Sequence, residues 1–228
     1  MAGLKHHALC SMLENNMHLH MTYFAGKAPN VELIPANDVT VVRSAINDDM
    51  FNYVLSARFT EHNAAARIEH VIRLFQEHSR PFSWWVGESD TPISLKDELS
   101  RHGLIFKEQD VGMILELHHF HPQAASRLNF KQVLQQQDLK EFGSIIQAIG
   151  GHPECYDRIY RHIPLNALRE GCPLEMHVAY LESTPIATGV LVLDGSIAGI
   201  YYVAVIQKTP SASYPYLPSP SFHSITNS

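Results

Sequence analysis

The stretch from Glu175 to Ile206, EMHVAYLESTPIATGVLVLDGSIAGIYYVAVI, decides the fold of this chain. Three strands are expected, over residues 176–181, 186–193 and 197–206. Asp194 and Gly195 separate the last two apolar, β-branched runs, and this dipeptide is a strong hairpin signal because both residues tolerate a positive φ. The stretch therefore predicts an antiparallel meander of three strands.

Upstream of this meander, helical and β-strand patterns alternate along the chain. Helical spacing of apolar residues or helix-ending residues predict helices over 4–24, 61–78, 94–102, 138–148 and 153–163. Short apolar runs bounded by turn residues predict strands over 31–34, 39–46, 51–59, 82–86 and 130–134, with a strand pair or one bent strand over 104–117. We expect Thr60 to cap the helix that starts near Glu61.

Composition limits the classes of partner. The 228 residues include 17 Lys and Arg against 23 Asp and Glu, a net charge of −6, so no overall basic field favours nucleic acid or an anionic membrane. The three cysteines are an odd number without CxxC spacing, which suits a reducing compartment. No apolar run reaches the roughly 18 residues of a membrane helix, and the N-terminus does not resemble a signal peptide. We expect a cytoplasmic protein with no nucleic-acid and no membrane partner.

A polar stretch and a change of composition divide the chain. The stretch from His118 to Arg127 predicts a boundary between a domain over 1–122 and a second domain over 123–206. Residues 209–228, TPSASYPYLPSPSFHSITNS, contain six Ser, four Pro and no charged side chain. Proline removes an amide donor and fixes φ, so we expect residues 207–228 to form an unstructured tail without helix or strand.

The order of elements resembles a known family. A strand, two short helices and the meander are similar to the first half of a GNAT-type N-acetyltransferase domain. The phrase PIATGVLVLDGSIAGIYYVAV resembles the strand pair that enters the acetyl-CoA site, and FSWWVGESDTPISLKDELSRHGLIFKEQDVGMILEL is similar to the degenerate upstream half of two-part members. The resemblance covers nearly all of residues 1–206.

The resemblance implies both a fold and an activity. The implied fold is α+β (α/β), a mixed, mainly antiparallel sheet flanked by helices, with an incomplete second domain. The implied activity is acetyl transfer from acetyl-CoA to a small-molecule or peptide amine. In the family, the strand that matches Val203, Ala204 and Val205 pairs with the pantetheine arm, so these three residues are the expected coenzyme-binding residues.

One family feature is missing from the sequence. In the family this strand runs into a loop of the form Q/R-x-x-G-x-G/A, whose bare amides bind the pyrophosphate. Here Gln207 to Ser213 contains no glycine, Gly199 is the last glycine of the chain, and Pro210 removes one donor. The chain is therefore expected to bind acetyl-CoA weakly or not at all, which leaves a non-catalytic remnant or interaction module as the alternative.

Two explanations of the missing loop stay open. One is a genuine short protein, and the other is a chain that departs from its ancestral reading after about Val205, as a frameshift would cause. In the alternative of a remnant or interaction module, the strand from Ile197 to Ile206 would present an open edge for self-association or for another chain if no later strand covers it.

No catalytic residue is assigned from the sequence. Strand alternation places only one of Tyr201 and Tyr202 toward the cleft, and either one fits as a plain sheet residue. Glu175 or Glu182 could in principle serve as a remote base, although a solvated strand end is the better explanation of each.

Other conspicuous residues receive structural explanations. Two groups of histidines lack the usual spacing of a zinc site, and no metal ligand is assigned. They are His18 with His20, and His118 with His119 and His121. Cys155, after His152, has no visible base or oxyanion pocket and is expected to be a small, partly buried residue. Of the pair Trp84 and Trp85, one ring is expected in a core and the other at its rim.

Overall fold

The computed structural model describes residues 2–117, 120–121, 128–149, 154–206 and 223–226. The chain forms two compact units. Unit 1 consists of Met1–Glu14, Asn30–Met113 and Pro218–Ser228, and unit 2 consists of Asn15–Pro29 and Ile114–Leu217. No helix in the described ranges is both long enough and apolar enough to cross a membrane.

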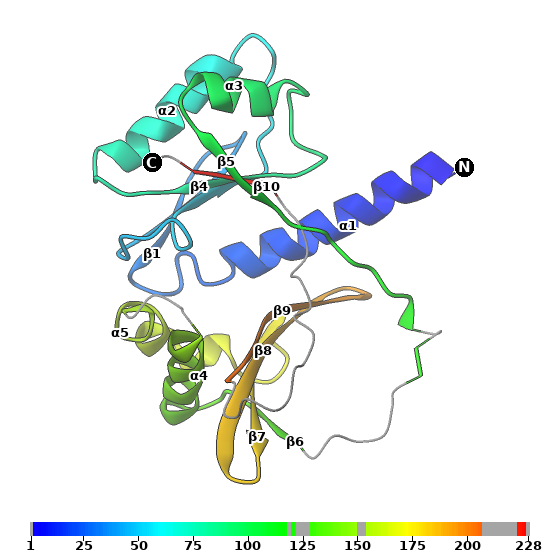
Figure 1. The fold of residues 1–228 in the computed structure, drawn as a ribbon, viewed down its shortest axis with the longest axis vertical. Coiled ribbons are helices and arrows are strands. Elements are labelled where there is room, and N and C mark those ends of the chain that lie inside the picture. The colour runs from blue at the N-terminus through cyan, green and yellow to red at the C-terminus, as the bar shows by residue number, and fades with distance from the viewer. Residues whose placement is uncertain (1, 118–119, 122–127, 150–153, 207–222, 227–228) are drawn as a thin grey trace. The chain divides into compact units, whose positions relative to one another are not determined.

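Unit 1 is built around a mixed sheet. Its strands are β1 (Val31–Ile34), β2 (Thr40–Ser44), β3 (Tyr53–Leu55), β4 (Ser83–Val86), β5 (Ile105–Gln109) and β10 (His223–Thr226). Their order in the sheet is β1-β2-β3-β4-β10-β5, and only the β3–β4 pair is parallel among the described pairs. The helices are α2 (Ala64–Gln76), α3 (Leu95–Arg101) and the first part of α1 (Ala2–Thr22) (Figure 1).

Helix α2 supplies one side of the core of unit 1. Its residues Ile68, Val71 and Phe75 recur at helical spacing and are fully buried against the sheet. The Trp84 ring belongs to the same core, whereas Trp85 is half-buried at its border. This confirms the expected split of the tryptophan pair.

The strand β10 corrects one expectation. Residues 207–228 are predicted to contain no strand, yet His223–Thr226 pairs with β4 on one side and β5 on the other (Figure 1). These four residues lie beyond the last proline of the chain, Pro220, so every backbone N–H is present to fill the gap between two strands. Residues 207–222 and 227–228 lie outside the described residues.

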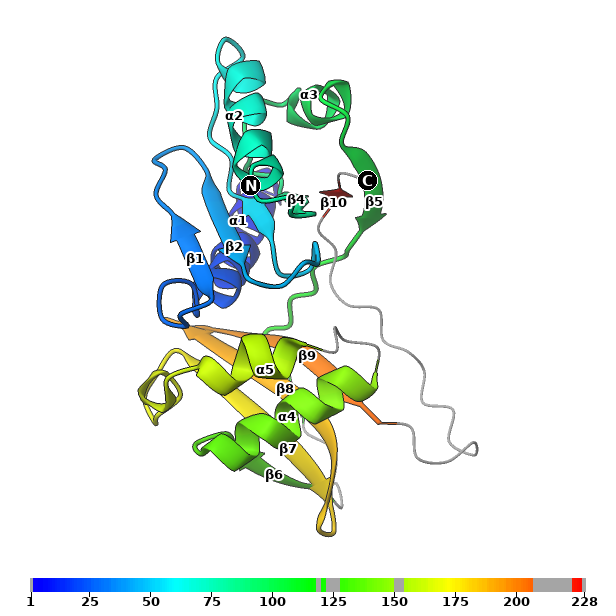
Figure 2. The ribbon, with the colours of Figure 1, turned by 90° about the vertical axis from the view of Figure 1, so that its left-hand side faces the viewer.

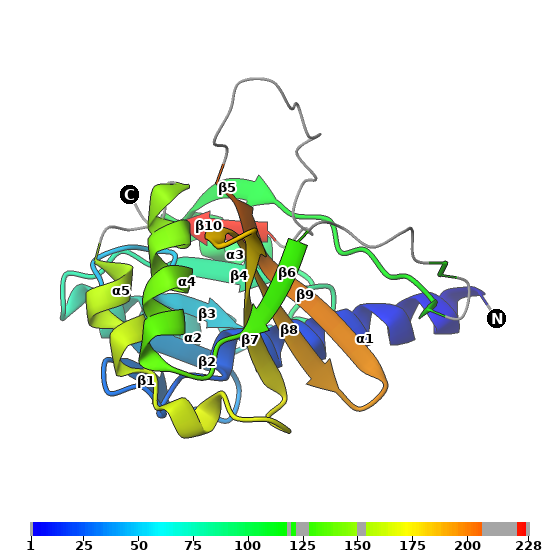
Figure 3. The ribbon, with the colours of Figure 1, turned by 90° about the horizontal axis from the view of Figure 1, so that it is seen from below.

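Unit 2 contains the predicted meander. Its strands are β6 (Leu128–Gln132), β7 (Leu174–Leu181), β8 (Thr184–Asp194) and β9 (Ile197–Val205), which run antiparallel in the order β6-β7-β8-β9 (Figure 3). The helical segments are α4 (Gln136–Ala148), α5 (Cys155–Arg158), η2 (Tyr160–His162) and η3 (Leu165–Ala167). Helix α4 lies against the sheet and buries Leu139, Phe142 and Ile146 there (Figure 2).

Most element predictions hold, and the exceptions have local reasons. The N-cap of α2 is Asn63, because Thr60 and Asn63 close a separate turn ahead of the helix through reciprocal hydrogen bonds. In the 104–117 segment only Ile105–Gln109 is strand, since only this part pairs with β10. The α+β class with a mainly antiparallel sheet is confirmed. The predicted domain limits at residues 122 and 206 stay predictions.

Candidate functional site

The three predicted coenzyme-binding residues lie on β9, at the edge of the sheet of unit 2. Among the described strands, only β8 pairs with β9. Ala204 lies opposite Thr188, and Val205 lies opposite Ala187. The outer side of β9 is therefore a sheet edge, the kind of surface that an extended ligand or another strand can pair with.

A bulge interrupts β9 just before these residues. Between two regular register positions, Gly189 of β8 faces both Tyr202 and Val203, which is one extra residue on β9. Tyr202 has φ +47°, a left-handed conformation that bulky residues rarely adopt. Its carbonyl accepts a hydrogen bond from the Thr188 hydroxyl at 2.9 Å, which holds the bulge in place. The bulge re-aims the strand at the start of the predicted contact.

The backbone direction of each residue follows from one hydrogen bond. The Ile206 N–H donates to the Ile186 carbonyl at 2.7 Å, so Ile206 faces β8. Because antiparallel strands alternate between paired and outward positions, Val205 directs its N–H and carbonyl to the outer edge, and Ala204 directs its own toward β8. Of the three residues, Val205 thus offers its backbone groups at the open edge, whereas Ala204 uses its own toward β8.

Side-chain exposure adds a separate distinction, between the two faces of the sheet. Val203 and Val205 are 68% and 57% exposed, and Ala204 is 5% exposed. Ile200, three residues before Val203 on β9, is 66% exposed. The edge therefore combines outward amides with exposed apolar groups, and no residue of β9 carries a charge. Such a surface can take an uncharged, extended ligand.

Tyr201 is tied to helix α1 and does not reach the edge. Its hydroxyl donates to the Asn16 Oδ1 at 2.7 Å, and its ring stacks on the His20 ring at 4.0 Å between centroids. The Asn16 Nδ2 in turn donates to the Val192 carbonyl at 3.2 Å. Burial raises the pKa of Tyr201 to about 12 and lowers the pKa of His20 to about 3, so both groups are neutral near pH 7. Tyr201 is a structural residue of this sheet.

Gly199 makes this contact possible. A Cβ at Gly199 would lie 1.8 Å from the Asn16 Oδ1, so any larger residue would push the amide away. Asn16 and His20 lie one helical turn apart on α1, and that spacing together with Gly199 is the only sign of the contact in the sequence. Tyr201 on the partner strand lies 185 residues after Asn16, and for this reason the sequence analysis did not identify Asn16 or His20 as its contacts.

The suggested remote bases do not lie on β9. The Glu175 Oε2 lies 3.0 Å from the His177 Nε2, and both residues belong to β7, two strands from the edge. Glu182 occupies the exposed turn between β7 and β8 with φ +57°. The position of Glu182 agrees with a solvated strand end, whereas Glu175 is half-buried and paired with His177.

The remaining candidates are also placed or excluded. His121 is exposed and His18 is half-buried on α1, whereas His118, His119 and the side chain of Cys155 lie outside the described residues. A hollow of about 530 Å³ is present at α4, α5 and η2. Its lining consists of exposed or half-buried side chains: Lys140, Ser144, Gln147, Tyr156, Asp157 and Arg161. No buried polar group of this lining faces the hollow, so β9 remains the candidate site.

Comparisons with known proteins match at the level of structure alone. No protein-family model matches the sequence, and a search of curated proteins finds no match. Among solved structures, a GCN5-related N-acetyltransferase from Kribbella flavida is 11% identical with a TM-score of 0.62, over 87% of this chain and 90% of that chain. A functionally unknown conserved protein from Staphylococcus epidermidis is 11% identical with a TM-score of 0.51, over 86% of this chain and 94% of that chain. The chain therefore has the fold of a GCN5-related N-acetyltransferase.

Proposed function

We propose that this chain is an acetyl-coenzyme A-dependent N-acetyltransferase by descent, and that the outer edge of β9 receives the pantetheine arm. The observation that carries the proposal is the bulged edge strand, in which Val205 points its backbone N–H and carbonyl away from β8. Pantetheine carries two amides in an extended chain, which are the complementary groups. The likeness of fold to a GCN5-related N-acetyltransferase supports the same assignment.

The reaction at this site is the attack of a neutral amine on the thioester carbonyl. Backbone N–H groups at the bulge are suited to stabilise the oxygen of the tetrahedral intermediate, because they are fixed in direction before the ligand arrives. The acceptor we propose is a small-molecule or peptide amine, in the cytoplasm. No side chain on β9 is an obvious base, so proton removal from the amine is left to solvent or to the acceptor itself.

The activity of this chain is proposed to be impaired. A coenzyme pyrophosphate is normally bound by consecutive amides at a glycine-containing helix start, and Gln207 to Ser213 offers no glycine and one proline. The pantetheine arm alone then contributes the affinity. We expect dissociation constants in the millimolar range for acetyl-CoA and for pantetheine, with little difference between the two.

An NMR titration of the amides of the full chain with pantetheine and with acetyl-CoA tests the site. We expect the amide signals of Val203 and Val205 to shift, together with that of Tyr202 at the bulge. Val205→Pro removes the outward N–H from an edge position where proline is tolerated, while Val205→Ala keeps it. One lost hydrogen bond should weaken pantetheine about 3- to 10-fold in the proline variant and leave the alanine variant near the parent.

Two outcomes would contradict the proposal. If the amides of β9 do not shift at millimolar ligand while others do, the site is elsewhere. If acetyl-CoA binds with micromolar affinity and pantetheine does not, a pyrophosphate site exists and the chain is not impaired.

A second candidate function is an interaction module that acts through the same edge. The observation that favours it is the uncharged strand β9 with exposed Ile200, Val203 and Val205, because natural edge strands usually carry charges or prolines against pairing. The partner we propose is a second copy of this chain, paired through β9. Val203→Lys should then abolish a concentration-dependent dimer in sedimentation velocity.

A matched control separates charge from position. Ile93 in unit 1 is 99% exposed and lies outside any strand, so Ile93→Lys adds the same charge elsewhere. It should leave the dimer unchanged. A monodisperse monomer of the parent chain at high concentration would contradict this second function and leave the first untouched.

A further inference from the structure

Three metal-ligating side chains meet on unit 1, far from β9 in the sequence. His6 and Cys10 lie one turn apart on α1, and Glu88 lies in the loop that follows β4. The His6 Nε2 is 3.6 Å from the Cys10 Sγ and 3.5 Å from the Glu88 Oε2. All three ligand atoms lie within 4.8 Å of one another.

Two of these three separations match the edges of a tetrahedral zinc site. Zinc bonds of about 2.3 Å to sulfur and about 2.0–2.2 Å to nitrogen and oxygen, at tetrahedral angles, place S and N about 3.6 Å apart and N and O about 3.4 Å apart. The observed distances are 3.6 Å and 3.5 Å. An ion could bind the three atoms with small side-chain adjustments only.

A catalytic triad would arrange the same residues differently. In a nucleophile–base–carboxylate triad, the thiol contacts one ring nitrogen and the carboxylate contacts the other. Here the Cys10 Sγ and the Glu88 Oε2 both approach the same nitrogen of His6, Nε2. Three ligand atoms that surround one point have the arrangement expected for metal ligation.

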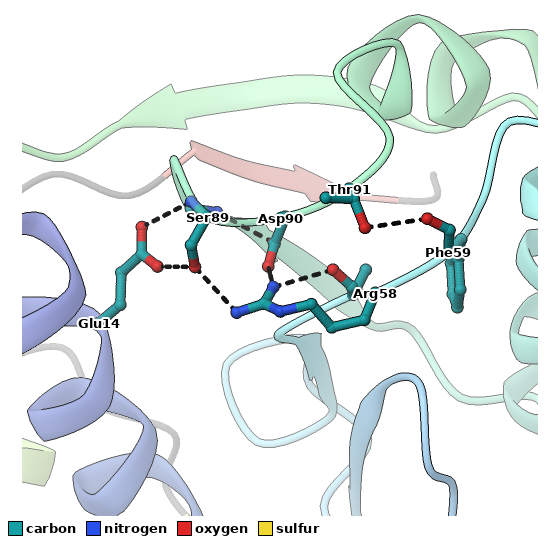
Figure 4. Close-up of polar contacts among 8 residues, drawn as sticks. Glu14, Arg58, Phe59, Ser89, Asp90 and Thr91 are labelled. Atoms are coloured by element: carbon teal, nitrogen blue, oxygen red, sulfur yellow. Dashed lines mark hydrogen bonds and ion pairs between the residues drawn. The ribbon is translucent and has the colours of Figure 1, made fainter. Parts of the chain in front are cut away.

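The loop that carries Glu88 is held in place from two sides (Figure 4). On one side, the Glu14 carboxylate accepts hydrogen bonds from the Ser89 N–H at 3.1 Å and from the Ser89 hydroxyl. On the other side, the Asp90 carboxylate accepts from the Gly87 N–H at 3.1 Å and from Arg58 at 2.7 Å. Glu88 lies between these anchors, so its backbone is ordered before any ligand binds.

Gly87 allows helix and loop to approach this closely. A Cβ at Gly87 would lie 2.6 Å from the Glu14 Oε1. The loop therefore packs directly against the face of α1 that carries Cys10 and Glu14, which are one turn apart. Preorganised ligands of this kind are what a metal site requires from its surroundings.

We propose that His6, Cys10 and Glu88 bind a zinc ion, with water as the fourth ligand. A mixed set of imidazole, thiolate and carboxylate in tetrahedral arrangement favours zinc over magnesium or calcium, which prefer oxygen ligands. The His6 and Glu88 side chains are 71% and 65% exposed, which leaves the fourth position open to solvent. On binding, a zinc–sulfur bond forms, the Cys10 S–H bond breaks, and the proton passes to solvent.

Titration of the tag-free full chain with Co²⁺, followed by displacement with Zn²⁺, tests the proposal. Tetrahedral cobalt with a thiolate ligand gives visible d–d bands and a near-ultraviolet sulfur-to-cobalt band. We expect both at one equivalent, and we expect Cys10→Ser to lose the sulfur band. The double variant Cys155→Ser/Cys172→Ser retains Cys10 and should keep the sulfur band unchanged.

Histidine and glutamate variants complete the test. His6→Ala should weaken zinc binding in calorimetry by at least about 10-fold, whereas His7→Ala, its exposed neighbour on α1, should leave binding at the parent value. Glu88→Gln should weaken zinc as well, with an unchanged circular dichroism spectrum. A sulfur band that survives in Cys10→Ser, or that disappears in the double variant, would overturn the assignment, and so would equal losses in His6→Ala and His7→Ala.

Discussion

Replacement of Asn16 by alanine is expected to loosen the attachment of α1 to β8 and β9. Asn16 is 1% exposed and makes two hydrogen bonds, one from the Tyr201 hydroxyl at 2.7 Å and one to the Val192 carbonyl at 3.2 Å. Alanine leaves both of these partner groups without their bond. All three residues belong to unit 2, so the effect concerns that unit.

The size of the effect follows from these two bonds. Each buried polar group that loses its partner costs about 1–3 kcal/mol, and the smaller side chain leaves a small cavity. We therefore expect Asn16→Ala to destabilise unit 2 by about 2–6 kcal/mol. Tyr201→Phe removes one bond only and should cost about 1–2 kcal/mol. Because the pair shares a bond, the double variant should cost about 1 kcal/mol less than the sum.

The assay has to observe unit 2 alone. Native-state hydrogen exchange of amides in β7 and β8 gives the opening free energy of that sheet directly. Both tryptophans of the chain, Trp84 and Trp85, belong to unit 1, so tryptophan fluorescence during urea unfolding follows unit 1 separately. Protection in β7 and β8 should fall in the Asn16 variant by the free energy given above.

Two results would refute this reasoning. One is a cost below about 0.5 kcal/mol for Asn16→Ala, which would mean that water replaces the lost bonds and that the amide is not buried. The other is strict additivity in the double variant, which would mean that Asn16 and Tyr201 do not interact.

Three further predictions concern single positions. Gly199→Ala should cost about as much as Asn16→Ala, because the new Cβ displaces the Asn16 amide, and hydrogen exchange in β8 measures it. Burial alone raises the pKa of Asp138, but the ammonium of Lys131 at 2.6 Å and two backbone N–H groups hold that pKa below its ordinary value. The stability that this carboxylate contributes is therefore complete above about pH 4 and is lost as the pH falls through the folded pKa. Unfolding measured at pH 3 and pH 6 should show a smaller loss of stability on acidification in Asp138→Asn than in the parent. Burial raises the pKa of Asp90 to about 6, so the folded state retains a proton that the unfolded state releases above pH 3.8. Unit 1 should therefore lose on the order of 2 kcal/mol of stability as the pH rises from 4 to 6, and urea unfolding of Asp90→Asn should lack this loss.

Local signals in the sequence were sufficient for most elements. The meander follows from Asp194 and Gly195 between β-branched runs, because a tight turn and its flanking strands depend only on neighbouring residues. The same holds for α2, whose apolar positions recur at helical spacing. The predicted location of Val203, Ala204 and Val205 on one apolar strand is confirmed, and their role as coenzyme ligands stays a prediction.

Long-range contacts could not be obtained in this way. Asn16 meets Tyr201 across 185 residues, and no pattern near either residue names the other. The bulge at Tyr202 depends on the pairing of β8 with β9, so a strict alternation of the two tyrosines is the wrong model for that strand. Of the proposed zinc ligands, His6 and Cys10 are visible as a pair one helical turn apart, whereas Glu88 is found only from the fold.

The position of β10 in the sheet of unit 1 has a consequence for biosynthesis. Strands β4 and β5 are both complete once residue 109 has been translated, yet the strand that joins them ends at Thr226. At about 5–20 residues per second, a ribosome needs about 6 to 23 s for the intervening 117 residues. During this interval β4 and β5 each lack the strand that pairs with them in the folded unit, so both edges stay open to other chains until the last residues have been made.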